Sequence, residues 1–174
     1  GAAYPGMAKS LYEKVSVFKT AFDECADACA TYLETGRKGL DELALSGNDT
    51  LSDSQELSQP ALFCLQVALA KTMVMLPDKK PVAVAGHSRG EIAAMCVAGG
   101  LLVRDAAKLV CGRGAAMASL SSGVGAMAAV RADGRKVTEL IGKVEDVTIA
   151  ADNSGLGCTL SGPIAAVDAA LSQC

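Results

Sequence analysis

The stretch AVAGHSRGEIAA, residues 83–94, indicates the fold class. Val82–Ala85 is a short apolar run typical of a buried strand, and the small-residue run Glu91–Ala98 is compatible with a helix. Between them lies a serine with a glycine two residues to either side. This order of strand, tight turn and helix predicts a nucleophile elbow centred on Ser88. The alternative is a simple turn in which the serine only caps the helix.

The chemistry of such an elbow depends on its backbone. We expect both Gly86 and Gly90 to be required, because a side chain at either position should collide with the backbone of the turn. The helix behind the serine offers unpaired N–H groups and the positive end of its dipole. Those groups suit a negative charge that develops on an oxygen atom during a reaction.

Composition limits the possible classes of protein. The 174 residues suggest one domain, or one and a part. Hydrophobic residues make up 51% of the chain but aromatic residues only 3%, so the core should consist of small, closely packed side chains. The net charge of −3 and the lack of a basic stripe argue against a nucleic-acid partner. No apolar run approaches the roughly 18 residues of a membrane span, and none is expected.

Seven cysteines and one histidine bear on location and metals. The cysteine count is odd and several lie on apolar helical faces, so they are interpreted as reduced, buried residues of an intracellular protein. The cytoplasm is the expected compartment, with plastid or mitochondrion as alternatives. A single histidine makes a metal site unlikely to form, and we predict none.

Helical patterns precede and follow the elbow. A helix is predicted from Met7 to about Tyr32, and a second with Pro60 in its first turn. Between these helices, residues 35–58 are polar and turn-rich, with a candidate capping box at Ser52-x-x-Gln55. After the elbow, Gly99-Gly100 is typical of a helix end. A further helix from Asp105 to about Ser119 should bury one face, formed by Leu109, Val110, Met117 and Leu120.

Arg113 falls on that same face. Burying an unpaired guanidinium is costly, so the side chain needs a partner. Two interpretations stay open on pattern alone. One is a structural salt bridge or a side chain that reaches solvent. The other is a receptor for a substrate carboxylate, whose two oxygens match the guanidinium fork.

The last third of the chain has a different pattern. Strands are predicted at 126–131, 147–151 and 158–161, and helices at 134–144 and from Pro163 onward. The order βαββα is that of a ferredoxin-like unit without its last strand. We therefore predict a boundary between residues 1–122 and 123–174. The first 120 residues hold a single predicted strand without neighbours, so the chain is expected to be truncated.

Five ordered motifs resemble a known family. They are SQPALF (58–63), GHSRGE (86–91), GRGAAM (112–117), GAMAAV (125–130) and NSGLGCTLSGP (153–163). In order and spacing they are similar to malonyl-CoA:acyl-carrier-protein transacylases and to the acyltransferase domains of polyketide and fatty acid synthases. The resemblance covers essentially the whole chain. It implies an α/β-hydrolase-like core that carries an inserted ferredoxin-like subdomain.

The resemblance also implies a reaction. Ser88 would take a malonyl-type group from a CoA thioester and pass it to the phosphopantetheine thiol of an acyl carrier protein. No cofactor would be bound. The backbone N–H of Arg89 would donate to the oxyanion, and Arg113 would pair with the free carboxylate of the acyl group. Gln59, His87 and Asn153 fall on motif positions that line the family's site, and His87 is expected to pack and hydrogen-bond beneath the elbow.

The chain departs from the family pattern in three places. The family's general base is a second histidine further downstream, and this sequence has none besides His87. In the family's N-terminal GQGxQ segment, the first glutamine, which supplies the other oxyanion donor, would precede Gly1, and Ala3 replaces the second glutamine. Arg89 stands where an uncharged residue is usual.

These departures keep two alternatives open. The chain could be a non-catalytic remnant or scaffold subunit that binds partners in a larger assembly. It could also be a serine hydrolase or thioesterase, although a carboxylate-binding arginine argues against a plain acyl chain. In the transferase interpretation its partners are malonyl-CoA or a relative, an acyl carrier protein, and the remainder of the synthase or neighbouring subunits.

Overall fold

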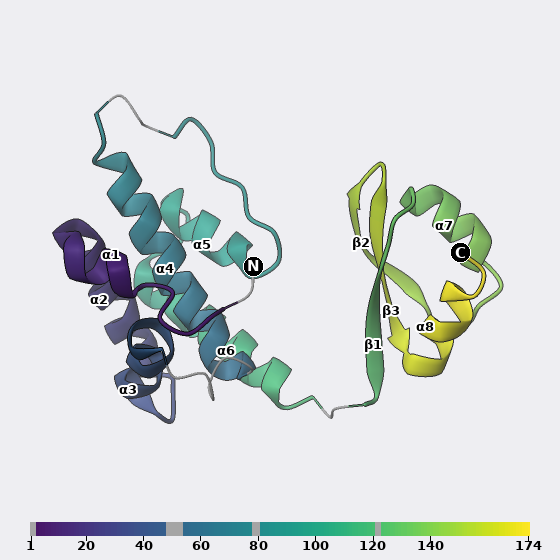
Figure 1. Ribbon diagram of the computed structural model, residues 1–174, viewed down its shortest axis with the longest axis horizontal. Coiled ribbons are helices and arrows are strands. Elements are labelled where there is room, and N and C mark those ends of the chain that lie inside the picture. Colours follow the sequence, from purple (N-terminus) through teal and green to yellow (C-terminus); the bar gives the residue numbers. More distant parts are fainter. Residues whose placement is uncertain (1–2, 48–53, 78–80, 121–122) are drawn as a thin grey trace. The chain divides into compact units, whose positions relative to one another are not determined.

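The chain consists of two compact units, Gly1–Leu120 and Ser121–Cys174. A computed structural model describes residues 3–47, 54–77, 81–120 and 123–174 (Figure 1). The division lies two residues before the boundary that the sequence predicts. Each unit has a hydrophobic cluster of its own, so the two are described separately.

The described part of the first unit is helical. Short elements form its start, and three longer helices, α2, α4 and α6, provide the frame. In order they are α1 (Lys9–Lys14), α2 (Ser16–Ala30), α3 (Gly36–Asp41), the single π-helical turn η1 (Glu42–Ser46), α4 (Gln55–Val74), α5 (Gly90–Val97) and α6 (Val103–Ala118). The helix predicted from Met7 to Tyr32 is therefore two helices.

The break between α1 and α2 lies at Val15, whose backbone is extended (φ −126°, ψ 103°). This break allows Tyr12 to fold back on α2. The ring of Tyr12 meets that of Phe22 edge to face at 5.6 Å, and its hydroxyl donates to Asp23 at 2.7 Å. A continuous helix would place residues 12 and 22 along one cylinder and prevent this contact.

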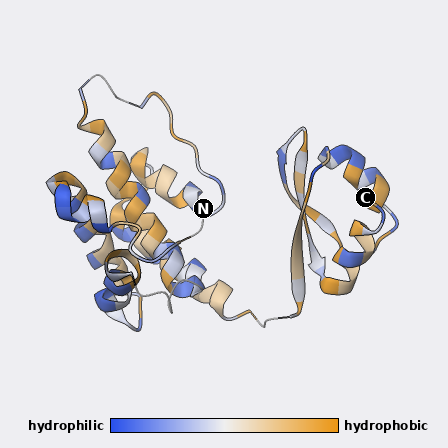
Figure 2. Cartoon of the chain, viewed as in Figure 1, coloured by the Kyte–Doolittle hydropathy of each residue, from blue (hydrophilic) through white to orange (hydrophobic). Residues whose placement is uncertain are grey.

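Helix α4 runs through the core of the first unit. It starts five residues before Pro60, because the Ser54 side chain accepts from the Leu57 N–H at 3.3 Å and caps the helix. The prediction that Pro60 lies in the first turn is thus wrong, and Ser52 of the expected capping box lies outside the described residues. Hydrophobic residues cover most of α4 (Figure 2). By length and composition, α4 is the one described helix that could span a membrane. However, 56% of its most apolar stretch is buried inside the protein, as in an ordinary core helix.

Helices α4 and α6 approach each other closely at Gly114. A Cβ atom there would lie 3.0 Å from the Gln55 carbonyl oxygen and 3.2 Å from the Glu56 Cα. The buried face of α6 is accordingly made of small residues, with Ala106, Ala107, Val110, Cys111 and Gly114. The predicted core face is wrong for Leu109, Met117 and Leu120, which are exposed. Small side chains are buried here because they permit the close approach.

The predicted strand Val82–Ala85 is absent. The described residues 81–87 form no strand, and the segment is exposed, with Val82 wholly so. A strand requires a hydrogen-bonded neighbour, and the described part of the first unit contains none. The segment is apolar in sequence, but the prediction that it is a buried strand is wrong for the structure described.

The second unit is a three-stranded antiparallel sheet with two helices. Its elements are β1 (Gly125–Val130), α7 (Gly134–Ile141), β2 (Thr148–Ser154), β3 (Gly157–Pro163) and α8 (Ile164–Leu171), so the predicted order βαββα is confirmed. The strand order is β1-β3-β2, which makes β1 and β2 parallel with β3 between them. Met127 pairs with Ser161 and Ile149 with Leu160.

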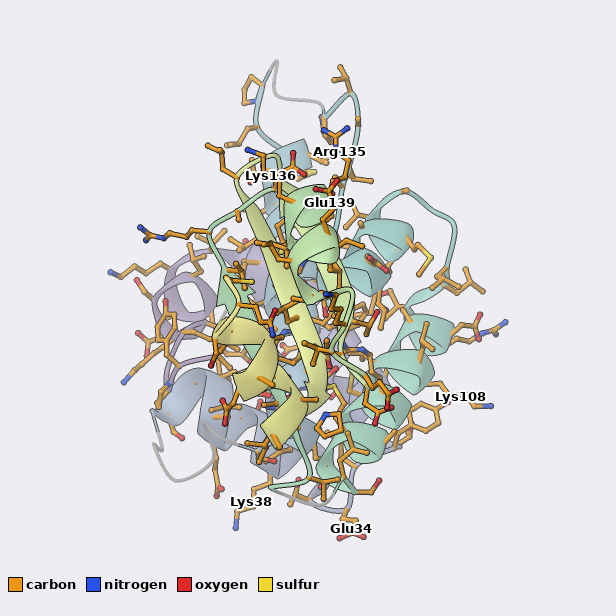
Figure 3. The ribbon with its side chains drawn as sticks, turned by 90° about the vertical axis from the view of Figure 1, so that its right-hand side faces the viewer. Glu34, Lys38, Lys108, Arg135, Lys136 and Glu139 are labelled. Atoms are coloured by element: carbon orange, nitrogen blue, oxygen red, sulfur yellow. The ribbon has the colours of Figure 1, made fainter. Side chains whose placement is uncertain are left out.

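One face of this sheet is covered by the helices. Leu160 and Cys158 point into a cluster with Val137 and Ile141 of α7. The other side of α7 faces solvent, where Arg135, Lys136 and Glu139 project from the helix (Figure 3). This amphipathic division is what the stripe of apolar residues in 134–144 predicts.

Candidate active site

Ser88 occupies a strained position at the start of α5. Its φ is +57°, one of two positive values outside glycine among the described residues. The Gly90 N–H donates to the His87 carbonyl at 3.0 Å, and the Glu91 N–H donates to the Ser88 carbonyl at 3.0 Å. These bonds hold the serine in the left-handed region, which costs energy for a residue with a Cβ. Such strain at a serine is typical of a nucleophile elbow.

The two glycines of the elbow differ in importance. A Cβ on Gly86 would lie 2.2 Å from the Gly90 carbonyl oxygen, so no side chain fits there. A Cβ on Gly90 would meet only Gln66 Nε2, at 4.0 Å. The sequence-based expectation that both glycines are required is therefore correct for Gly86 and wrong for Gly90, because the crowding falls on one side of the turn.

Ser88, Arg113 and Gln59 come together from three separate segments. Arg113 of α6 donates from Nη2 to Ser88 Oγ at 3.1 Å and from Nη1 to Gln59 Oε1 on α4. Gln59 is 1% exposed. Its Nε2 in turn donates to the Met117 sulfur at 2.9 Å. The motifs around residues 59, 88 and 113, which are distant in sequence, thus build one polar cluster.

The half-buried guanidinium of Arg113 forms no ion pair with the residues that the structure describes. Among the residues that the structure describes, no carboxylate lies within salt-bridge distance of Arg113. Its two partners, Gln59 and Ser88, are neutral. A structural salt bridge is therefore not found among the described residues, whereas a side chain that reaches solvent and a receptor for a substrate carboxylate both stay predictions. An uncompensated guanidinium beside a strained serine is suited to a substrate that carries a negative charge.

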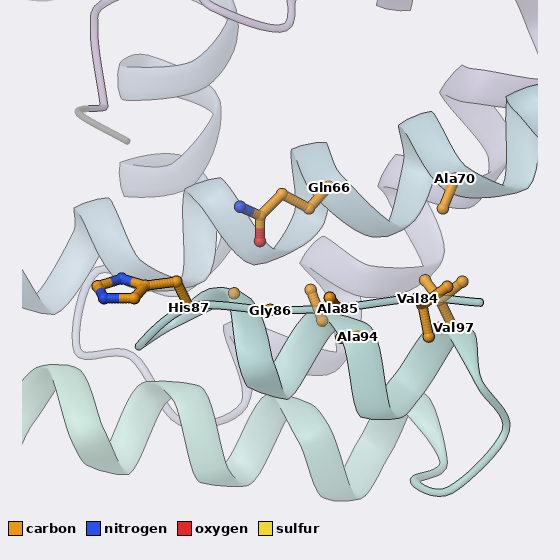
Figure 4. Close-up of a pocket in the computed structure, with 10 residues that line it drawn as sticks. Gln66, Ala70, Val84, Ala85, Gly86, His87, Ala94 and Val97 are labelled. Atoms are coloured by element: carbon orange, nitrogen blue, oxygen red, sulfur yellow. The ribbon is translucent and has the colours of Figure 1, made fainter. Parts of the chain in front are cut away.

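His87 does not pack beneath the elbow as expected. It is exposed, and in the described part of the chain its side chain makes no hydrogen bond. It borders a cavity of about 400 Å³ between α4, α5 and residues 84–87 (Figure 4).

Arg89 and Asn153 are the remaining predicted site residues. Arg89 is the N-cap of α5 and lies at the positive end of that helix, so its expected role as a backbone oxyanion donor stays a prediction. Asn153 belongs to the second unit. It is exposed on β2, and its Nδ2 donates to Thr159 Oγ1 at 3.1 Å. Its predicted role in lining the site also stays a prediction.

Two residues were missed by the sequence interpretation. Met117 had been placed on a core face, yet its sulfur is an acceptor for Gln59. Its position one helical turn after Arg113 was the available signal. Gln66 lines the cavity below the elbow, and its buried Oε1 lacks a hydrogen-bond partner among the described residues. Nothing in the pattern around residue 66 singled it out. In the described part of the chain, no group of metal-ligating side chains is found.

Comparisons with known proteins agree with this geometry. The model of the acyl transferase domain matches residues 1–174. A phenolphthiocerol polyketide synthase of Mycobacterium marinum is 40% identical over 99% of this chain, which spans 8% of that relative. The curated relatives are much longer than the chain, which spans 2% to 8% of each.

Solved structures show the same likeness. The acyltransferase domain from the second module of the salinomycin polyketide synthase is 38% identical, with a TM-score of 0.86 over 99% of this chain and 39% of that one. The malonyl-CoA:acyl carrier protein transacylase of Xanthomonas oryzae is 32% identical, with a TM-score of 0.82 over 99% of this chain and 54% of that one. The α/β fold is thus that of acyltransferase domains. The chain belongs to the acyl transferase domain family.

Proposed function

We propose that the chain provides the acyl-accepting part of an acyltransferase site for carboxylated, malonyl-type acyl groups. One observation carries the proposal. Ser88 Oγ lies 3.1 Å from the guanidinium of Arg113, and no carboxylate among the described residues compensates that charge. A serine at a strained elbow supplies the nucleophile, and an uncompensated cation beside it selects an acidic substrate.

The proposed reaction has two balanced steps. Ser88 Oγ attacks the thioester carbonyl carbon of malonyl-CoA, loses its proton to a base, and the C–S bond breaks to release CoA as its thiol. The phosphopantetheine thiol of a carrier protein then attacks the acyl ester, and Ser88 regains its proton. In the acyl-enzyme, Arg113 exchanges its bond to the serine for a pair of bonds to the free carboxylate. The backbone N–H of Arg89, at the positive end of α5, donates to the oxyanion.

Other parts of the reaction come from outside residues 1–174 in this proposal. The sequence contains one histidine, His87, and its exposed ring directly before Ser88 cannot easily turn back onto the serine hydroxyl. The general base and the second oxyanion donor are therefore supplied by another segment or subunit. We also propose that Ser121–Cys174 is the ferredoxin-like subdomain of an α/β-hydrolase-like core, which the split βαβ arrangement supports.

The proposal names partners and a compartment as well. Malonyl-CoA or a relative is the donor, an acyl carrier protein the acceptor, and the remainder of a synthase the structural neighbour. The chain binds no cofactor of its own. An intracellular, reducing location, with the cytoplasm favoured, is supported by seven free cysteines. Burial raises the pKa of the Cys25 thiol to about 12 and also raises that of Cys64, which keeps both in the unreactive thiol form.

A second candidate function is a non-catalytic scaffold subunit. It is favoured by the single histidine of the sequence, since without a base the serine reacts slowly. A thioesterase is less well supported, because Arg113 would face an uncharged acyl chain. The scaffold and the transferase differ in one measurable property, which is whether Ser88 becomes acylated.

The decisive experiment is incubation of the protein with malonyl-CoA, within the assembly that supplies the general base, followed by intact-mass analysis and peptide mapping. The transferase proposal expects an acyl adduct on Ser88 that is absent from Ser88→Ala. Arg113→Ala should lose malonyl loading in preference to acetyl loading from acetyl-CoA. If the parent and Ser88→Ala give the same masses, the scaffold function is favoured and the transferase proposal fails.

A further inference from the structure

Both polar atoms of the Gln59 amide have a hydrogen-bond partner, a donor for the oxygen and an acceptor for the nitrogen. Arg113 offers only donors, so the amide oxygen faces it. The thioether of Met117 is only an acceptor, and the amide nitrogen faces it at 2.9 Å. Both contacts demand the same orientation of one buried side chain. Each partner therefore reinforces the orientation that the other requires.

We propose that Met117 is a positioning residue that acts through Gln59 on the guanidinium of Arg113. This inference rests on the proposed function and goes beyond it by assigning a role to the thioether. If the sulfur is removed, Gln59 Nε2 becomes an unpaired buried donor and the amide rotates to seek another acceptor. Rotation withdraws Oε1 from Arg113, which then loses the bond that orients it toward Ser88.

The helix pair explains why this contact forms. Arg113 and Met117 are one turn apart on α6 and therefore share a face. Between them, Gly114 lets α6 approach α4 so closely that a Cβ would lie 3.0 Å from the Gln55 carbonyl oxygen. Gln59 projects from α4 into this narrow space and is 1% exposed. The contact is built by rigid elements, not by a loop.

The amide of Gln59 and the thioether of Met117 are both uncharged, so they leave the charge of Arg113 unchanged. A carboxylate in place of the Gln59 amide would orient Arg113 equally well but would also neutralise it. An amide backed by a thioether orients the guanidinium and leaves its positive charge for the substrate. Hence Met117 should affect how well an acidic acyl group is held, and should affect an uncharged acyl group little.

The test uses Met117→Leu, which keeps the volume and removes the acceptor. The control is Met73→Leu near the other end of α4 from Gln59, where the side chain is 58% exposed. In the ¹⁵N-labelled protein, hydrogen exchange of the Gln59 side-chain amide should be about tenfold faster in Met117→Leu, because a bond of about 1.4 kcal/mol is lost. Met73→Leu should leave that exchange unchanged. Equal protection in Met117→Leu and the parent overturns the proposal.

A second readout concerns substrate preference. The KM for malonyl-CoA in Ser88 loading should rise about tenfold in Met117→Leu, while acetyl-CoA loading stays within about twofold of the parent. Parallel changes for both substrates would mean a merely structural role and would overturn the inference. A parent that loads no acyl group defeats the proposed function instead, and the exchange of the Gln59 amide then decides alone on Met117.

Discussion

Similar strand-like sequences form a paired, buried strand in the second unit and an exposed segment in the first. In the second unit, the strands that hold Ala128 and Ile149 both pair with the strand that holds Leu160, and Leu160 is completely buried. In the first unit, the equally apolar Val82–Ala85 stays exposed beside the elbow. The difference lies in the availability of a neighbour, because the second unit brings three strands together within 54 residues, whereas the described part of the first unit supplies one segment only.

The contrast between buried Leu160 and exposed Val82 is the first point to test. Leu160→Ala should lower the free energy of unfolding of the second unit by about 3 kcal/mol, since a fully buried leucine leaves a cavity. Val82→Ala should change stability by less than about 0.5 kcal/mol. Chemical denaturation followed by circular dichroism measures both. A Val82→Ala effect as large as that of Leu160→Ala would show that segment 82–85 is buried in solution.

The two glycines of the elbow offer a second test, within one turn. Gly86→Ala should destabilise the elbow by about 2 kcal/mol, because its Cβ would overlap the Gly90 backbone. Gly90→Ala should cost less than about 1 kcal/mol, as its Cβ would meet only Gln66 Nε2, at an ordinary contact distance of 4.0 Å. Thermal unfolding and the rate of Ser88 acylation report on both variants. Equal losses would contradict the one-sided crowding of the turn.

Charge compensation of Arg113 gives a third test. Gln59→Glu places a carboxylate where the neutral amide accepts from the guanidinium, and the new ion pair should neutralise the charge offered to the substrate. The ratio of malonyl to acetyl loading should fall about tenfold, which corresponds to about 1.4 kcal/mol. Paired loading assays with the two CoA esters measure the ratio. An unchanged ratio would remove Arg113 from carboxylate selection.

The smallest expected effect concerns the ion pairs of α2. Burial raises the pKa of Asp23, but hydrogen bonds from Lys19, Arg37 and Tyr12 outweigh burial and hold that pKa below its usual value of 3.8. The folded state thus favours the carboxylate, so its stabilisation is present above the unfolded pKa and is lost as pH falls through the lowered folded pKa. Asp23→Asn should destabilise the first unit by at most about 1 kcal/mol at neutral pH.

The difference in stability between the parent and Asp23→Asn should vanish in strong acid. Unfolding midpoints of the parent and Asp23→Asn, measured from neutral pH downward, should converge once the pH lies below the lowered folded pKa of Asp23, where both carry an uncharged side chain. Asp27→Asn is the matched control, because Asp27 pairs with the same Arg37 but is 70% exposed. A constant gap between parent and Asp23→Asn at all pH values would mean that the substitution acts by packing and not by charge.

Sequence patterns predicted the structure correctly where it depends on residues a few positions apart. The elbow helix, the glycine end at Gly99 and the βαββα order all follow from spacing of apolar residues and from turn residues. Patterns failed where a second segment decides the outcome. The large residues of α6 lie outside because α4 approaches at Gly114. The start of α4 is a different case, because Ser54 caps the helix locally and Pro60 is the wrong signal for its first turn.

The residues of the candidate site also fall into those that motifs predict and those that only contacts between segments reveal. Ser88, Arg113 and Gln59 could be named from motifs, and the structure brings these three together. Met117 could not be assigned its role, since an apolar residue one turn from an arginine is more often core than acceptor. The unpaired Gln66 oxygen and the exposure of His87 likewise depend on what the neighbouring helices leave open. Such contacts arise between segments and leave no periodic trace in either one.

The sequence by itself determined the elbow helix, the βαββα order of the second unit, the serine turn and the residue types of the polar cluster. These depend on interactions between residues a few positions apart, which spacing and side-chain type report directly. Tertiary structure alone decided which face of α6 is buried, and that the charge of Arg113 is left uncompensated among the described residues. Those outcomes depend on how closely two distant helices can approach, and that distance is set by packing.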